Sequence, residues 1–440
     1  MNQFRRIAQR VQDQFANPQT RMLMFFGIEG MLFQFVTSMA AANGFGTNLY
    51  ATNLGATDNQ IGMIQLVASL AALALLLPVG VVSDRMKNAK TVPVALMALM
   101  GVMYFFYGTV PAMGERRMTF FFVFLAITAG MQSTYNSIWQ AFFGDVTPME
   151  QRNRVYAFRN RFVYIIATAA PILCGMLLTA MPDSESKLTV LRVFYYLCGV
   201  LALTNAWVIS RIPGGRRSPE MLAQTPKISP KAIGSVLGGL FRDRKFLVYF
   251  GSVMFFYCSW HFDWSMWYIG QIQYVKMTEA DLSLYNALAC LGQLLVMGFF
   301  VRMVEKKGTM FTFLIALVSL ALCPMVMFAS LAAAPMGYGP ITMIVLAAVV
   351  FSPQCAVNLC LVQMLLDAIP EKNRSLIVSL NMMFVTLSNA FVPFLGVQLY
   401  TALGSDLRAY KLFMLTALIF RTTTLVIFVL RYLAGRRAEN

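Results

Sequence analysis

Charged residues are scarce in this sequence. Asp, Glu, Lys and Arg make up 12% of its 440 residues, whereas a soluble domain carries about 25%. Apolar residues make up 58% of the chain. This composition excludes a string of soluble domains, and it excludes a disordered chain because disorder requires low hydrophobicity. The sequence is therefore typical of a protein that crosses a membrane several times.

Residues that carry catalytic or metal-binding chemistry are also few. His261 is the single histidine, and no cluster of metal ligands, no nucleophile–base pair and no Walker A pattern is visible in the sequence. The seven cysteines all fall within apolar runs, which indicates reduced packing residues and no disulfide framework. We therefore predict no enzymatic activity, no metal and no cofactor. No cleavable signal peptide is evident.

The apolar residues form twelve runs, and each is long enough for a transmembrane helix, which needs about 20 residues. Each run predicts a helix, because an unpaired strand leaves its backbone groups unsatisfied in lipid. We therefore predict an all-α integral membrane fold with twelve transmembrane helices. The runs lie near residues 22–47, 60–81, 91–113, 118–143, 154–181, 189–210, 246–273, 283–302, 310–333, 340–366, 375–402 and 409–433.

Lys and Arg are unevenly distributed between these runs. The two tails and every second segment hold about four times as many as the other segments, when the basic first turn of the fifth run is counted with its loop. Such an excess marks the cytoplasmic side. The distribution predicts a multi-pass protein of the cell inner (plasma) membrane with both termini in the cytoplasm. The same distribution explains the net charge of +16, because the basic residues mark the orientation in the membrane and do not indicate nucleic acid binding.

The order of runs and loops predicts two halves. A cytoplasmic N-tail (1–21) precedes a six-helix bundle (22–210), and a basic linker (211–245) leads to a second bundle (246–433) and a C-tail (434–440). A polar pattern that recurs at an offset of 222 residues supports this division, because parallel repeats are one plan of transporters. The offset pairs Gln132 with Gln354, Asn136 with Asn358, Asp145 with Asp367, Pro148 with Pro370, Arg152 with Arg374 and Pro171 with Pro393.

The segment after the second run reads Gly80-Val-Val-Ser-Asp84-Arg85-Met-Lys87-Asn-Ala-Lys90. It resembles the G-x-x-x-D-R-x-G-R-R/K signature of the major facilitator superfamily, although Lys87 stands in place of the second glycine. The D-x-x-P-x-x-x-R turns after runs four and ten are also similar to turns of that superfamily. The resemblance implies two pseudo-symmetric six-helix bundles around a central cavity, with helices 1, 4, 7 and 10 at the cavity.

The resemblance also implies a conformational switch at the cytoplasmic ends of the helices. Asp84 would cap a neighbouring helix and pair with an arginine, and Gly80, Arg85 and Lys90 would complete the turn. A solvated turn that follows the positive-inside rule is the alternative. The repeated turns predict gates or helix-end clamps at Asp145, Arg152, Asp367 and Arg374.

Two acidic residues, Glu29 and Asp263, lie well inside apolar runs. An ionisable group at that depth costs about 3 kcal/mol on insertion scales, so each is a functional candidate. The resemblance places both on cavity helices, and we predict that they couple protons. On the first run, Phe33 and Asn43 share the face of Glu29 and are candidates for contact with substrate. A structural Glu29 that pairs with an arginine is the alternative.

The seventh run places Trp260, Asp263, Trp264 and Trp267 on one helical face. An acid is costly in hydrocarbon, so the face is predicted to turn inward and to suit a cation or a ring with polar substituents. The alternative is an interfacial tryptophan belt with an acid near the outer surface. His261 lies on another side of this helix. It is a candidate for proton exchange, and its alternative is a hydrogen-bonded core residue.

Two amide pairs lie one helical turn apart in the fourth and tenth runs, Gln132 with Asn136 and Gln354 with Asn358. Their symmetric positions predict a polar lining that contacts substrate, and the alternative is helix–helix packing. Arg421 lies in the middle of the last run. It predicts an inward-facing structural ion pair whose partner the sequence does not name, and an anion site is the alternative.

These observations together predict a monomeric secondary active transporter that moves a small organic solute through the lipid bilayer by alternating access. We expect protons to drive it, and the aromatic and acidic face favours efflux of an amphipathic or cationic compound. One alternative is proton-coupled uptake of a sugar or other nutrient, which the amide pairs would suit. The other is a membrane sensor or scaffold that has the fold and does not transport.

Overall fold

The computed structural model describes residues 18–148, 151–219, 238, 241–368 and 374–439. Within these ranges the side chains at 18, 19, 77, 81, 84, 152–154, 157, 245, 362, 366, 374–380 and 436–439 lie outside the description. The regular elements of the described residues are helices, with one isolated antiparallel bridge between Asn88 and Arg216. The prediction of an all-α fold is confirmed.

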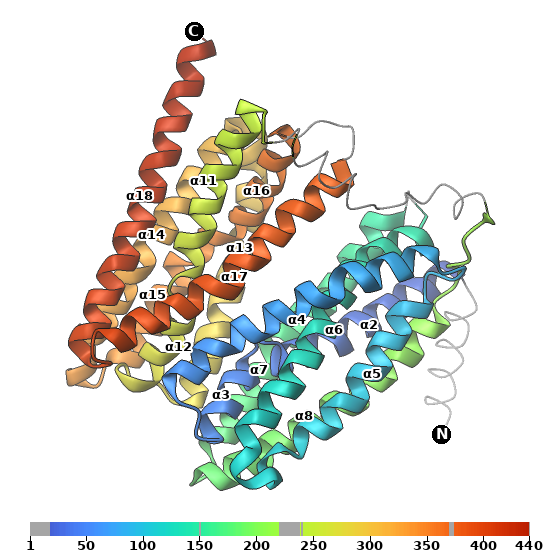
Figure 1. Ribbon diagram of the computed structural model, residues 1–440, viewed down its shortest axis with the longest axis horizontal. Coiled ribbons are helices and arrows are strands. Elements are labelled where there is room, and N and C mark those ends of the chain that lie inside the picture. Colours follow the sequence, from blue (N-terminus) through green and yellow to red (C-terminus); the bar gives the residue numbers. More distant parts are fainter. Residues whose placement is uncertain (1–17, 149–150, 220–237, 239–240, 369–373, 440) are drawn as a thin grey trace, which may run out of the picture. The chain divides into compact units, whose positions relative to one another are not determined.

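Each predicted apolar run corresponds to one helix or to two consecutive helices (Figure 1). The first half contains α2 (Pro18–Ala40), α3 (Phe45–Asn53), α4 (Asp58–Arg85), α5 (Thr91–Gly108), α6 (Arg117–Val146), α7 (Arg152–Thr179) and α8 (Ser184–Arg211). The second half contains α11 (Arg244–His261), α12 (Trp264–Gln273), α13 (Glu279–Lys307), α14 (Thr309–Ala333), α15 (Gly339–Val350), α16 (Cys355–Ala368), α17 (Arg374–Ala402) and α18 (Leu407–Glu439).

Ten helical stretches of the described residues are long and apolar enough to cross a membrane. The bent pair of α15 and α16, whose axes differ by 44°, makes eleven if it is counted as one span. The chain is thus a multi-pass membrane protein, and the twelfth span remains a prediction.

Three predicted helices are interrupted, where the sequence analysis expected continuous ones. The first breaks at residues 41–44, where Gly44 approaches the preceding turn so closely that a Cβ would lie 2.8 Å from the Thr37 carbonyl oxygen. The seventh breaks at Phe262 and Asp263. The tenth breaks at a 3-10 turn that contains Pro353, which has no N–H for the helical ladder.

The described helices fall into two compact units. Of the described residues, unit 1 takes those within Met1–Gly55, Leu70–Leu173 and Met181–Pro226, and unit 2 takes those within Ala56–Ser69, Cys174–Ala180 and Lys227–Asn440. The units follow the two halves of the chain, except that the first turns of α4 and the last turns of α7 belong to unit 2. The predicted domain boundaries remain predictions.

The core of unit 1 is rich in aromatic rings. Tyr50, Tyr104, Tyr107 and Phe121 are fully buried, and Tyr195 packs against the rings of Tyr50 and Tyr107 at centroid distances of 4.7 and 4.5 Å. The Tyr50 hydroxyl donates a hydrogen bond of 3.0 Å to the Tyr107 carbonyl oxygen. These contacts hold α3 against α5, α6 and α8.

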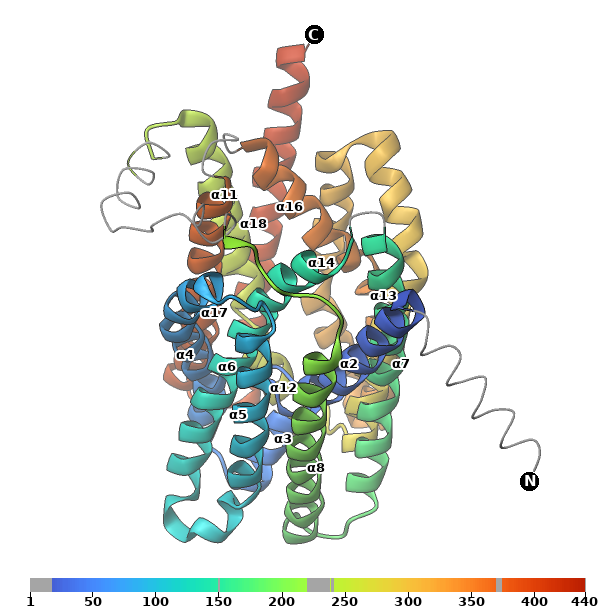
Figure 2. The ribbon, with the colours of Figure 1, turned by 90° about the vertical axis from the view of Figure 1, so that its right-hand side faces the viewer.

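Helices α5 and α8 run side by side in unit 1, as both Figure 1 and Figure 2 show. Glycines permit this approach, since a Cβ on Gly199 would lie 3.0 Å from the Gly101 carbonyl oxygen and 2.9 Å from the Phe105 ring. Larger side chains at Gly199 would push the two helices apart.

We predict that Gly199→Leu destabilises the protein by about 1–3 kcal/mol, because overpacking a close helix contact has that cost. Gly251→Leu on α11 is the matched control, since a Cβ there meets no atom within 4 Å. Thermal unfolding in detergent should show a lower midpoint for Gly199→Leu alone. Equal midpoints for the two variants would contradict the packing argument.

Candidate functional site

Glu29 lies at the centre of a polar cluster in unit 1. Its carboxylate is completely buried and accepts hydrogen bonds from Arg159 Nε at 2.6 Å and from Arg159 Nη2 at 3.3 Å. The Tyr135 hydroxyl donates a further bond of 2.8 Å to Oε1. The guanidinium of Arg159 stacks over the Trp139 ring, with Cζ 4.1 Å from the centroid. This geometry is the arginine-paired alternative for Glu29, with both carboxylate oxygens bonded.

The other unit 1 candidates are distributed around this cluster. Phe33 packs on Tyr135 at a centroid distance of 4.7 Å, and Gln132 Nε2 donates to Thr37 Oγ1 at 3.2 Å. Asn136 is exposed. Asn43 lies in the break after α2 and is exposed there, so its predicted place on the helical face of Glu29 is wrong. Asn43 would share the face of Glu29 only on a continuous helix, and the chain does not form one there.

We predict that Arg159→Met destabilises the protein by about 3–5 kcal/mol, because it leaves the buried Glu29 carboxylate without its counter-charge. The double variant Glu29→Leu/Arg159→Met should recover most of this loss, since it removes both charges. Thermal unfolding midpoints in detergent measure both effects. A double variant that is less stable than Arg159→Met would contradict the prediction.

In unit 2, Asp263 lies in the break between α11 and α12. It is completely buried, and Arg421 of α18, which is 4% exposed, donates from Nη2 to Asp263 Oδ1 at 2.6 Å. Arg421 Nη1 also donates to the Leu320 carbonyl oxygen at 2.9 Å. Among the described residues, Asp263 Oδ2 and Arg421 Nε have no hydrogen-bond partner. Asp263 is therefore the partner of Arg421 that the sequence left open.

A cavity of about 250 Å³ adjoins this ion pair within unit 2. Its wall consists of aromatic side chains from α11, α12 and α13, neighbouring groups of α14 and the α15–α16 turn, and the guanidinium-bearing Arg421. The lining residues are Trp260, Trp264, Trp267, Tyr285, Leu320, Cys323, Phe351, Gln354 and Arg421. The three tryptophans thus line a cavity within unit 2. Asp263 is not part of the wall.

The remaining candidates of unit 2 are Gln354, Asn358 and His261. Gln354 Nε2 donates to Cys323 Sγ at 3.0 Å, and Asn358 is exposed like its repeat partner Asn136. His261 is buried, and its Nδ1 lies 3.1 Å from the Ser388 hydroxyl. That contact matches the alternative of a hydrogen-bonded core histidine.

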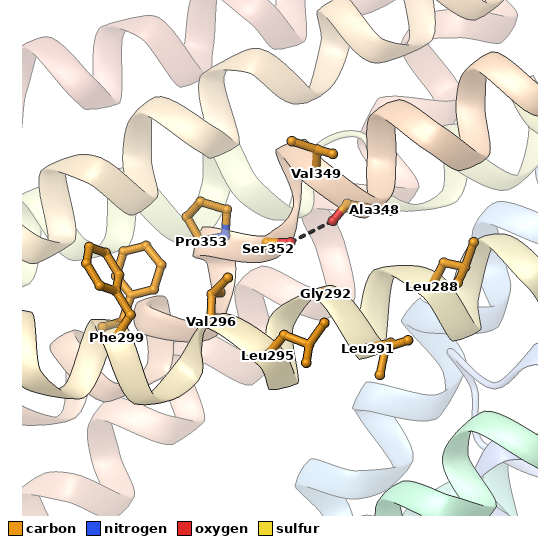
Figure 3. Close-up of a pocket in the computed structure, with 11 residues that line it drawn as sticks. Leu288, Leu291, Gly292, Leu295, Val296, Phe299, Ala348, Val349, Ser352 and Pro353 are labelled. Carbon is orange, nitrogen blue, oxygen red and sulfur yellow. Dashed lines mark hydrogen bonds between the residues drawn. The ribbon is translucent and has the colours of Figure 1, made fainter.

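A larger hollow of about 570 Å³ between α13 and α15 contains none of the predicted site residues (Figure 3). Leucines, Val296 and Phe299 dominate its wall, and the hydroxyl of Ser352 is bonded to the Ala348 carbonyl oxygen at 2.6 Å. A solute site needs polar groups that orient the solute. The smaller cavity beside Arg421 meets that need better.

Asp145, one of the predicted switch residues, forms an ion pair with Arg217, a residue outside the predicted set. Arg217 donates to Asp145 Oδ2 from Nε at 2.9 Å and from Nη2 at 2.7 Å, and its Nη1 donates to the Ser83 carbonyl oxygen at 2.6 Å. Backbone bonds from Ala89 to Gly215 and from Arg217 to Lys87 fix the same segment. The start of the linker is thus tied to the ends of α4 and α6.

The structure describes the surroundings of some of the other predicted switch residues. Lys90 donates to the carbonyl oxygens of Ser210 and Ile212, and burial, followed by the charge of Arg21, lowers the pKa of its amine. Gly80 has no neighbour where a Cβ would be, and Arg85 and Asp367 are exposed. The side chains of Asp84, Arg152 and Arg374 lie outside the described residues.

We predict that Arg217→Gln weakens the attachment of the linker by about 1 kcal/mol, the value of a partly exposed ion pair. Amide hydrogen exchange at Ala89, whose N–H donates to the Gly215 carbonyl oxygen, should then be roughly fivefold faster, since 1.4 kcal/mol is tenfold. Arg216→Gln is the control, because Arg216 is exposed and only its backbone takes part in the bridge. Unchanged exchange in Arg217→Gln would show that the backbone pairing alone holds the segment.

Comparison with known proteins gives a family and a fold. The model of the Major Facilitator Superfamily matches residues 30–361, and no curated protein matches the chain. A mutant of the nucleoside transporter NupG superposes with a TM-score of 0.70 at 12% identity, covering 93% of this chain and 99% of that one. A bacterial homologue of the iron transporter ferroportin in the inward-facing state gives 0.67 at 15% identity, with 93% and 98% covered.

A POT family transporter in complex with a thioalcohol-conjugated peptide is also similar, with a TM-score of 0.68 at 12% identity and coverage of 95% and 96%. These three proteins carry chemically different cargoes by their names. At such identities the likeness concerns the fold alone.

Proposed function

The chain belongs to the major facilitator superfamily, and from that premise we propose that it is a secondary active transporter of a small organic solute. In this proposal the cavity of unit 2 holds the solute, and the Asp263–Arg421 pair carries the coupling proton. Transport proceeds by alternating access in a monomer. Both termini lie in the cytoplasm, in agreement with the distribution of Lys and Arg.

The observation that carries the proposal is the ion pair between Asp263 and Arg421 beside an aromatic cavity. Burying two charges costs several kcal/mol each, and well-packed apolar residues often serve stability as well or better. Ionisable residues inside membrane spans accordingly mark solute and proton pathways. A sensor or scaffold has no use for such a pair next to a cavity, so the observation favours transport.

Of the three proton-coupling candidates, Glu29, His261 and Asp263, we assign the coupling proton to Asp263. Its Oδ2 has no hydrogen-bond partner among the described residues, which leaves a position for a proton on the residue that pairs with the cavity-lining Arg421. Both oxygens of Glu29 are bonded to Arg159 or Tyr135, and His261 contacts Ser388. We therefore assign Glu29 and His261 structural roles.

The charge of the cavity wall bears on the solute. The expectation of a cationic compound rested on Asp263 facing the solute among tryptophans. Asp263 is not among the residues of the wall, and Arg421 neutralises its charge. The reason to expect a cationic solute therefore no longer applies. The guanidinium of Arg421 and the amide of Gln354 are among the polar groups of the wall, and they suit the uptake alternative.

We predict that Asp263→Asn abolishes solute-dependent proton movement, because the amide does not titrate. The test uses proteoliposomes with trapped pyranine and pooled small organic acids, amines and sugars. The control is Glu29→Leu/Arg159→Met, which removes the structural ion pair of unit 1 and should leave proton movement intact. Wild-type proton movement in Asp263→Asn would overturn the coupling role, and no movement with any pool in the wild-type protein would favour the scaffold.

A further inference from the structure

We propose that the solute is a small organic anion, a carboxylate on a planar apolar body, which replaces Asp263 as the partner of Arg421 once Asp263 is protonated. This inference rests on the proposed function and names the substrate class of the same cavity. It also fixes the stoichiometry, because each bound anion requires one proton.

The charge of the wall is the first support. Among the described residues that line the cavity, Arg421 is the only charged one, and five of the other eight are aromatic. A cavity with one guanidinium and no carboxylate in its wall attracts negative charge. A cation would meet Arg421 at close range in a medium of low dielectric, where like charges repel strongly.

The hydrogen bonding of Arg421 is the second support. A guanidinium has five N–H donors in a rigid plane, which matches the two oxygens of a carboxylate. Arg421 donates to Asp263 and to Leu320, and its buried Nε has no partner. Donor capacity therefore remains for an incoming carboxylate, which forms stronger hydrogen bonds with arginine than a neutral acceptor does.

The shape of the cavity points to a flat, apolar body of small size. Trp260 meets Trp264 edge to face at 5.6 Å, and Trp267 meets Phe351 edge to face at 5.5 Å, so the walls present ring surfaces at right angles. A volume of about 250 Å³ holds on the order of ten heavy atoms, given about 30 Å³ for a water molecule. A phenyl ring with a short carboxylate side chain has that size.

Charge balance links the anion to a proton. With Asp263 ionised, an incoming carboxylate would place two negative charges on one arginine in a buried site. One proton taken from water onto Asp263 Oδ2 restores neutrality: Arg421 pairs with the ligand carboxylate, and Asp263 becomes a neutral hydrogen-bond donor. Release reverses both steps, and the proton returns to water.

The groups that face Asp263 leave it as the one carboxyl for this exchange. Charged or titratable neighbours come from α18 with Arg421 and Tyr410, from α13 with Tyr285 and from α14 with Cys323. None of these is a second carboxyl or a histidine. Binding of proton and anion together is symport, so the inference favours the uptake alternative over efflux.

The test uses three probes with one ring and three charges: phenylacetate, phenylacetamide and phenethylamine. Binding to the purified full-length chain is followed by tryptophan fluorescence, to which Trp260, Trp264 and Trp267 contribute three of the five indoles. Phenylacetate should bind best, phenylacetamide at least tenfold more weakly, and phenethylamine not measurably. Between pH 6 and 8 phenylacetate stays ionised, and its Kd should rise by up to tenfold per pH unit because binding takes up one proton.

Two variants separate the parts of the inference. Asp263→Asn is permanently neutral, so phenylacetate should bind at pH 8 as tightly as at pH 6. Asp263→Asn/Arg421→Gln removes both charges together and should lose at least tenfold in phenylacetate affinity while its unfolding midpoint stays near that of Asp263→Asn. The control Glu29→Leu/Arg159→Met should behave like the wild-type protein.

Several results would overturn the inference. These are tightest binding of phenethylamine, equal binding of phenylacetate and phenylacetamide, a pH-independent Kd in the wild-type protein, or no binding of any probe. Proton movement in proteoliposomes distinguishes this failure from that of the proposed function. Movement with an amine or a sugar and none with phenylacetate would leave the transporter standing and refute the anion.

Discussion

The ion pair between Asp263 and Arg421 determines the chemistry available to unit 2. Each charge alone in a buried site would be strongly destabilising, so the two residues pair, and together they join α18 to the break between α11 and α12. Three tryptophans line the same cavity as Arg421. Any event that changes the charge of one partner must be compensated at the other, which makes the pair a natural point of coupling.

Unit 1 also contains a buried carboxylate, Glu29, and other groups compensate its charge. Glu29 also pairs with an arginine, but a tyrosine hydroxyl and a tryptophan face complete the cluster. The sequence repeat does not relate the two pairs, since the offset of 222 residues places Gly251 opposite Glu29 and Gly199 opposite Arg421. The features that the halves share, such as Gln132 and Gln354, belong to the common fold. The pairs are specific to each half, and in the proposed function only the pair of unit 2 takes part in transport.

Much of the fold follows from hydropathy, because every apolar run forms a helix or two consecutive helices. The breaks within the helices do not follow from hydropathy, because mean hydropathy over twenty residues is insensitive to a four-residue turn. The predicted position of Asn43 is wrong for that reason. Arg159 falls within the basic turn that topology explained, although it lies buried against Glu29. The partner of Arg421 lies 158 residues away in sequence, and no local pattern encodes such a pairing.

The interruption before α12 has an electrostatic consequence. Because α12 begins at Trp264, its first N–H groups have no acceptors in a preceding helical turn. The aligned peptide dipoles of the helix place about half a positive elementary charge at this end, beside Asp263. A continuous helix would use those N–H groups on its own carbonyls and cancel the effect. Part of the positive potential at this point therefore belongs to the main chain, and it persists when the arginine side chain is replaced.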